Sequence, residues 1–229
     1  ALLDEEEQAV PTLSVASEAE GGEEEPGFKP APLPVFLGGE REDAAARAGT
    51  ATHLFMQFCD FTRLRDGGAE RELARLREGQ FLSAEDAALV RLEEIEAFRR
   101  SPMLRALCEG GRVWRELRFH VHLPAYALTA DPEKKRSLAD RRVLVQGVMA
   151  AVLECEDGRL WLIAYTPDRL SYGERKDPAA AARRLCERHG LQLSYYAAAC
   201  RQIFGRLPDR VLIYSLHLGD AVSLPPSSL

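Results

Sequence analysis

The sequence predicts an α/β domain, in which several helices are followed by three strands, a long helix and one or two final strands. The first observation is a series of amphipathic helical patterns between residues 43 and 108. The second is a set of apolar runs rich in β-forming residues between 112 and 166. The third is a helical stretch at 178–204 that precedes another apolar run at 210–218. This mixed order of elements is typical of α/β domains.

Four helices are expected before the first strand. They span residues 43–60, 69–78, 84–99 and 101–108. In the first of them Leu54, Phe55 and Phe58 recur at helical spacing. Ser83 precedes the third as a typical N-cap residue, and Pro102 suits the first turn of the fourth. The helices therefore form one N-terminal part of the domain.

The strands follow from alternating or continuous apolar runs. We expect them at 112–123, 143–154, 159–166, 210–218 and, as a short last strand, 221–224. Asp157 and Gly158 separate two apolar runs, which is a strong hairpin signal. Residues 124–140 form a polar connector between the first two strands. Pro178 opens the long helix, which we expect to break or bend near Gly190.

Charge divides the chain into two parts. Residues 1–43 hold 12 Asp/Glu and 2 Lys/Arg, whereas the other residues hold 24 and 28. Residues 1–37 are also rich in Pro, Gly and Ser, so we expect an acidic, flexible linker before a folded domain at 38–229. An alternative function of the linker is an acidic arm that mimics DNA in a basic groove. The domain itself is mildly basic, which is compatible with phosphate contacts.

Composition excludes several classes of protein. The five cysteines contain no CxxC pair, which argues against a zinc knuckle and a disulfide framework and favours reduced thiols in the cytoplasm. No apolar run approaches the roughly 20 residues that span a bilayer, so we expect no membrane partner. Phosphate-loop, dinucleotide-binding, zinc-peptidase and serine-hydrolase motifs are all absent. The first residue, Ala1, leads us to expect a piece of a longer protein.

Several short motifs occur in a fixed order along the domain. They are Gly49–His53, Glu116–Phe119, Gln146–Ala150, Ile163–Thr166, Gln192–Tyr196 and the pair Phe204-Gly205. In this order and spacing they resemble the nuclease domain of the RecB family, within the PD-(D/E)XK superfamily. The likeness is greatest to the AddA-like (RexA-like) family of bacterial helicase–nuclease subunits. It covers about residues 33 to 225.

The resemblance implies a restriction-endonuclease-like core, with a mixed central sheet flanked by helices. It places this domain at the C-terminus of an ATP-dependent helicase–nuclease that acts in DNA double-strand-break repair and recombination. The implied partners are DNA, the rest of the parent helicase chain and an AddB-like protein. Active members of the family hold Mg²⁺ with two strand aspartates and a helical histidine, and use a nearby lysine in phosphodiester hydrolysis.

This chain departs from the pattern at the catalytic positions. Ala150 and Ala164 replace the two aspartates, and Thr166 replaces the lysine. His53, Glu116, Gln192 and Tyr196 remain and are interpreted as a vestigial site. Two lost carboxylates remove most of the hard oxygen ligands that Mg²⁺ requires.

We therefore expect no cofactor in this domain and no cleavage of DNA, with His53 and Asp168 as weak metal candidates. Retention for guiding single-stranded DNA or for structure is the first hypothesis. The second is an active magnesium-dependent exonuclease that uses His53, Glu116, Asp168 and His120. The third is an interaction module that docks a partner through the helices at 69–108.

Overall fold

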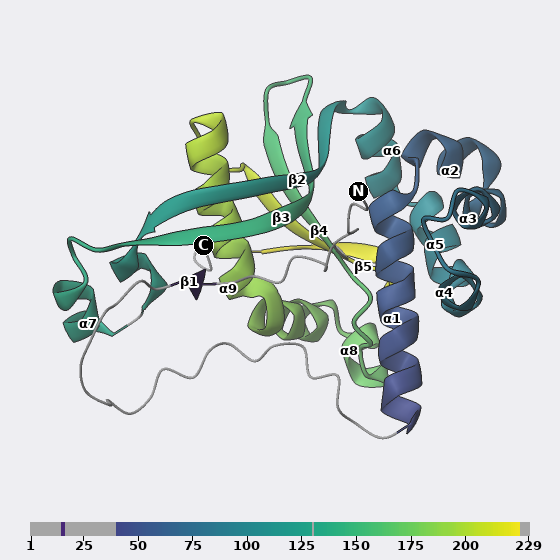
Figure 1. Cartoon of the computed structure of the whole chain (residues 1–229), viewed down its shortest axis with the longest axis horizontal. Coiled ribbons are helices and arrows are strands. Elements are labelled where there is room, and N and C mark those ends of the chain that lie inside the picture. The colour runs from purple at the N-terminus through teal and green to yellow at the C-terminus, as the bar shows by residue number, and fades with distance from the viewer. Residues whose placement is uncertain (1–14, 17–39, 130, 225–229) are drawn as a thin grey trace, which may run out of the picture.

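The computed structural model describes residues 15–16, 40–129 and 131–224 (Figure 1). Its helices are α1 (Glu40–Phe58), α2 (Phe61–Gly67), α3 (Ala69–Glu78), α4 (Ala84–Leu89), α5 (Leu92–Arg99), α6 (Pro102–Glu109), the 3₁₀ helix η1 (Ala125–Leu128), α7 (Pro132–Ser137), α8 (Tyr172–Lys176) and α9 (Pro178–Phe204). Its strands are β1 (Val15–Ala16), β2 (Gly111–Pro124), β3 (Arg142–Cys155), β4 (Leu160–Thr166), β5 (Arg210–Ser215) and β6 (Asp220–Ser223).

The strands form one mixed sheet. Its hydrogen-bonded order is β1-β3-β4-β5-β6, and β2 pairs with β3. Neighbours pair antiparallel except β4 and β5, which are parallel and are connected through α8 and α9. The predicted α/β class, with a mixed sheet, flanking helices and an N-terminal helical part, is confirmed and is consistent with a PD-(D/E)XK-like core.

The sheet separates two hydrophobic cores, and helices cover both of its faces. Ile163 of β4 and Leu212 of β5 lie in the core that the N-terminal helices close. Their neighbours Leu162 and Ile213 point to the core beneath α9. Figure 1 shows α1 to α6 grouped on one side of the strands and α9 on the other. Strands covered on both faces explain the continuous apolar runs in the sequence.

The helical part differs from the prediction in two places. The single helix predicted at 84–99 is wrong, because the chain divides into α4 and α5 at Val90. There the backbone N–H of Arg91 donates to the Thr52 hydroxyl at 3.1 Å, and its guanidinium donates to the carbonyl of Pro167 at 3.2 Å. These contacts come from distant parts of the sequence. Helix α2, capped by the Asp60 side chain, was not predicted.

The strands agree with the prediction within a few residues. The connector at 124–140 contains η1 and α7, which the polar composition did not indicate. Helix α9 keeps helical hydrogen bonding from end to end and changes direction part-way, as Figure 1 shows. Of the predicted linker, Val15–Ala16 pair with β3, and the rest lies outside the described residues. No described helix is long and apolar enough to cross a membrane.

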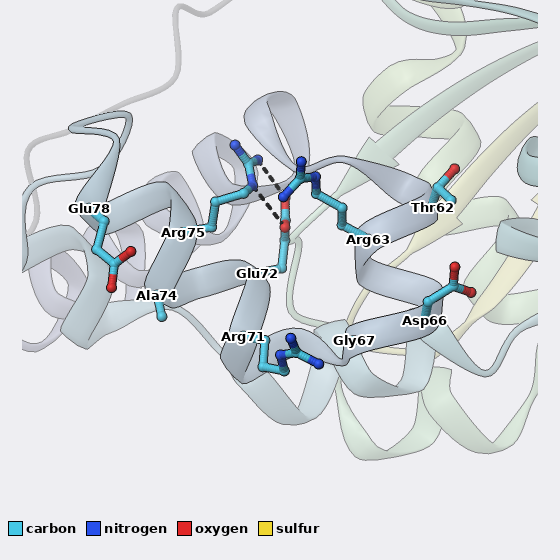
Figure 2. Close-up of a pocket in the computed structure, with 9 residues that line it drawn as sticks. All are labelled: Thr62, Arg63, Asp66, Gly67, Arg71, Glu72, Ala74, Arg75 and Glu78. Atoms are coloured by element: carbon cyan, nitrogen blue, oxygen red, sulfur yellow. Dashed lines mark hydrogen bonds and ion pairs between the residues drawn. The ribbon is translucent and has the colours of Figure 1, made fainter.

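A buried carboxylate holds the N-terminal helices together (Figure 2). The side chain of Glu72 on α3 accepts the backbone N–H of Asp60 at 2.7 Å, just before α2 begins. It also accepts two hydrogen bonds from the Arg75 guanidinium, at 2.5 and 2.9 Å. Glu72 is only 2% exposed, so these donors replace the water that it loses.

We expect Glu72→Ala to lower the free energy of unfolding by about 1–3 kcal/mol, because it leaves the Asp60 N–H without its partner. Glu78→Ala is the matched control, since Glu78 is exposed on the same helix. Urea denaturation of both variants measures the difference. Equal losses would show that the buried contact contributes nothing specific.

Candidate functional site

Three positions predicted from the sequence, Glu116, Ala150 and Ala164, lie near the point where the pairing of β3 with β4 ends. The β2–β3 pairs Arg115–Ala151 and Leu117–Met149 place Glu116 opposite Ala150, whereas Ala164 is one residue beyond the last β3–β4 pair, Ala151–Ile163. Ala150 packs against the core of the N-terminal helices and Ala164 against the core beneath α9. We call these three residues the cross-strand row.

The side chains of the two longest strands exchange faces of the sheet at this row. Glu116 has a φ of 48°, in the left-handed region that non-glycine residues rarely adopt. Trp114 and Leu117 of β2 both lie against the core beneath α9, although a regular strand would place them on opposite faces. Met149 and Val152 of β3 show the same change. Strained backbone of this kind clusters at functional sites.

Glu116 is the carboxylate of the row. It is half-buried, and burial raises its pKa, an effect that Arg115 and Arg118 partly oppose. The Arg115 guanidinium is already engaged by the carbonyls of Met56 and Cys59 at the end of α1. Arg115 therefore joins β2 to the helical part, whereas Arg118 lies further along the strand.

Two polar side chains of α9 lie beside the row. The Gln192 side-chain amide donates to the Tyr196 hydroxyl at 2.9 Å, so two predicted residues meet directly. The Tyr196 hydroxyl also lies near the backbone of Val148 on β3, which partly offsets the effect of burial on its pKa. The Glu116 carboxylate is near enough to raise the pKa of Tyr196, beyond the larger effect of burial. The structure thus brings Glu116, Gln192 and Tyr196 near one another, beside the part of β3 that precedes Ala150.

A glycine makes this approach of α9 to the sheet possible. The Phe119 and Tyr196 rings meet edge to face, with centroids 5.2 Å apart. A Cβ on Gly147 would come within 3.0 Å of the Phe119 ring and 3.2 Å of the Tyr196 ring. Three of the sequence motifs therefore meet at one contact, in which Phe119, Gly147 and Tyr196 pack together.

Thr166, which the sequence resemblance aligns with a lysine, belongs to a different cluster. It is buried, and its hydroxyl lies 3.5 Å from Nε2 of His189 and accepts the Asp168 N–H at 3.2 Å. The Asp168 carboxylate lies 3.0 Å from the same His189 nitrogen and 2.9 Å from the Arg188 guanidinium. His189 and Arg188 hold the pKa of Asp168 well below its usual range. Asp168 is thus already engaged by Arg188 and His189.

His53 lies on α1, one helical turn beyond Gly49. A Cβ on Gly49 would be 3.6 Å from the Pro167 ring, so this face of α1 packs beside the end of β4. The His53 side chain is open to solvent, yet the surrounding protein lowers its pKa by desolvation. No described contact joins His53 to Glu116, Gln192 or Tyr196.

The residues present do not fit a magnesium ion held by a carboxylate cage. Mg²⁺ prefers oxygen ligands, and in the cross-strand row only Glu116 carries a carboxylate. Asp168 is engaged by Arg188 and His189. In the part of the chain that the structure describes, no three His, Cys, Asp or Glu residues gather as a metal-binding group. The alternative set of His53, Glu116, Asp168 and His120 therefore does not form there.

Comparison with known proteins assigns this frame to a family. The chain is 35% identical over 187 residues to the AddA protein of the ATP-dependent helicase/nuclease from Pelotomaculum thermopropionicum, a match that covers 81% of the chain. It is 32% identical over 186 residues to the AddA protein of Geobacillus kaustophilus and 33% over 188 residues to that of Moorella thermoacetica, each again covering 81% of the chain. The chain is homologous to one segment of the AddA helicase/nuclease family. No protein-family model matches it.

The match covers a small part of each AddA protein. The chain spans 14%, 15% and 12% of the length of these three relatives, so it corresponds to a domain-sized piece of a much longer protein. Within this piece, His189 and Arg188 were not predicted as site residues. They precede Gln192 by three and four residues, so they share its face of the helix, which is the signal that would have found them.

We expect Gly147→Ala to lower the free energy of unfolding by about 1–3 kcal/mol, because the added methyl group overpacks the Phe119–Tyr196 contact. Gly190→Ala is the control, since nothing lies within 4 Å of its Cβ position on α9. In a helix interior the change from Gly to Ala should raise the free energy of unfolding by roughly 0.5–1 kcal/mol. Thermal unfolding of both variants shows whether each is less or more stable than the unaltered chain. A neutral Gly147→Ala would contradict the packing role.

The contribution of the Asp168 cluster to the stability of the fold should depend on pH. Its depressed pKa means that ionised Asp168 stabilises the fold above the ordinary carboxyl pKa of about 3.9, and that this stabilisation disappears as the pH falls below it. Asp168→Asn should therefore destabilise at pH 7 and progressively less at pH 4 and pH 3. Asp140→Asn, at an exposed position, is the control in urea denaturation. A loss that does not change with pH would show that ionisation is not its cause.

Proposed function

We propose that this chain is the nuclease-superfamily domain of a bacterial AddA-like helicase–nuclease, and that it has lost cleavage while continuing to guide a DNA strand. The homology to AddA proteins supports the helicase–nuclease context. The observation that carries the proposal is the cross-strand row, where Ala150 and Ala164 offer no metal ligand beside Glu116. Double-strand-break repair would place the parent protein with the cytoplasmic chromosome.

The proposed loss of cleavage also changes how the site meets DNA. With aspartates at both alanine positions, a phosphodiester would approach several negative charges and would need a cation between them. Here it meets Glu116 and, nearby, the neutral groups of Gln192 and Tyr196. A DNA strand is therefore expected to bind without a divalent cation. Other parts of the parent chain and an AddB-like protein would supply the motor and the cleavage.

A second candidate function is docking of a protein partner through the helical part. Phe58 and Phe81 are 39% and 48% exposed, and their ring centroids lie 5.6 Å apart on the surface. This is the observation that favours an interaction module. Binding of single-stranded DNA distinguishes the two candidates, because a module of the second kind would not bind it in a salt-dependent manner.

We expect the unaltered chain to leave a labelled oligonucleotide intact with Mg²⁺ or Mn²⁺ and to bind it equally well in EDTA. Restoring Ala150→Asp, Ala164→Asp and Thr166→Lys together should make binding depend on divalent cation, with cleavage as the stronger result. The matched control carries Asn at positions 150 and 164 with Thr166→Lys, which adds similar bulk without the two acids.

Two outcomes would contradict this proposal. Cleavage by the unaltered chain that His53→Ala abolishes would show an active site with a rearranged metal set. If the aspartate and asparagine variants respond identically to Mg²⁺, the row is not the former metal site. Isothermal titration with Mn²⁺ reads out metal binding independently of cleavage.

A further inference from the structure

Strands β2 and β3 extend beyond β4 as a long ribbon, and the short strand β1 pairs with β3 along it at residues 144 and 145. They pair from the Gly111–Cys155 pair to the Pro124–Arg142 pair, whereas β3 and β4 pair only over residues 151–154 of β3. Residues 117–124 and 142–149 therefore project past β4, and Figure 1 shows them reaching towards α7. We call this part the ribbon. It begins at the cross-strand row.

The two faces of the ribbon are different. One face packs on α9 and contains Phe119, Val121 and Leu123, which are 5%, 6% and 4% exposed. On the other face Arg118, His120 and His122 follow one another at every second residue, and all three are exposed. Side chains of this column lie about 7 Å apart along β2. No element in the described part of the chain covers the column.

Cations continue from this column to the tip of the ribbon. Residues 117–142 contain six Lys/Arg and three Asp/Glu. The six are Arg118, Lys134, Lys135, Arg136, Arg141 and Arg142. All are exposed, and among the described residues none of their side chains forms an ion pair. Elsewhere the arginines beside carboxylates are paired, as Arg75, Arg99, Arg159 and Arg188 are.

We propose that this open face of the ribbon is the track along which the backbone of single-stranded DNA reaches the cross-strand row. The inference rests on the proposed strand-guiding function and assigns it to a surface. The path from Pro124 to Glu116 is about 26 Å long, enough for several nucleotides. The exposed cationic and histidine side chains form a single column, which suits the sugar–phosphate backbone of one DNA strand. Arg and His side chains can also stack on unpaired bases.

The position of Arg118 connects the track to the site. Its guanidinium is close enough to Glu116 to oppose the effect of burial on that carboxyl, so the column begins beside the row. The backbone on either side is well supported, since Gln202 of α9 donates to the carbonyl of His122 at 3.0 Å from the covered face. A rigid strand that presents donors at regular intervals is suited to positioning phosphates.

The test measures binding of a fluorescent 20-nucleotide oligothymidine to the whole chain by anisotropy at several salt concentrations. The track variant is Arg118→Glu with Arg142→Glu. The matched control is Arg77→Glu with Arg105→Glu, which reverses two exposed arginines on α3 and α6. We expect the track variant to bind on the order of tenfold more weakly. Its log–log salt slope should fall by about 1.4, which corresponds to two lost phosphate contacts on a single strand.

A photo-crosslinking residue at His120 gives a second readout that does not depend on affinity. We expect a crosslink to the oligonucleotide from His120 and none from the same residue placed at Arg77. Equal weakening by the track and control variants, or a crosslink from Arg77 alone, would overturn the track while leaving strand binding intact. Absence of salt-sensitive binding by the unaltered chain would instead overturn the proposed function, and the track with it.

Discussion

The close approach of α9 to β3 is the constraint on which the site depends. It is possible because Gly147 has no side chain where the Phe119 and Tyr196 rings meet. From this contact the geometry of α9 places Gln192 one turn away from Tyr196. The same face continues to His189 at the end of β4. Phe119, Gly147 and Tyr196 thus have packing roles, which hold this frame together independently of any catalytic group.

The charges near the site are arranged differently in the cross-strand row and around Asp168. In the cross-strand row Ala150 and Ala164 carry no charge, and the apolar side chains around them belong to the two cores. An unpaired carboxylate at such partly buried positions would be costly without a metal ion. After the end of β4 the Asp168 carboxylate is paired with Arg188 and lies 3.0 Å from Nε2 of His189. We interpret both features as a site stabilised without a divalent cation.

The sequence predicted the sheet well, because hydrophobic runs and the Asp157-Gly158 turn are local signals. It could not predict the break between α4 and α5, which depends on contacts of Arg91 with residues far along the chain. The left-handed conformation of Glu116 has no signature in a strand-like sequence. Motif order did locate the row and the Gln192–Tyr196 pair. His189 was not predicted, because its partners Thr166 and Asp168 lie on a different part of the chain.

The central claim is that the row beside Glu116 no longer holds a divalent cation. Anomalous diffraction from crystals of the chain soaked in Mn²⁺ tests it most directly, because the metal is located without reference to activity. We predict no manganese peak beside Glu116, Ala150 or His53. A well-occupied peak bound by the Glu116 carboxylate and the His53 imidazole would contradict it.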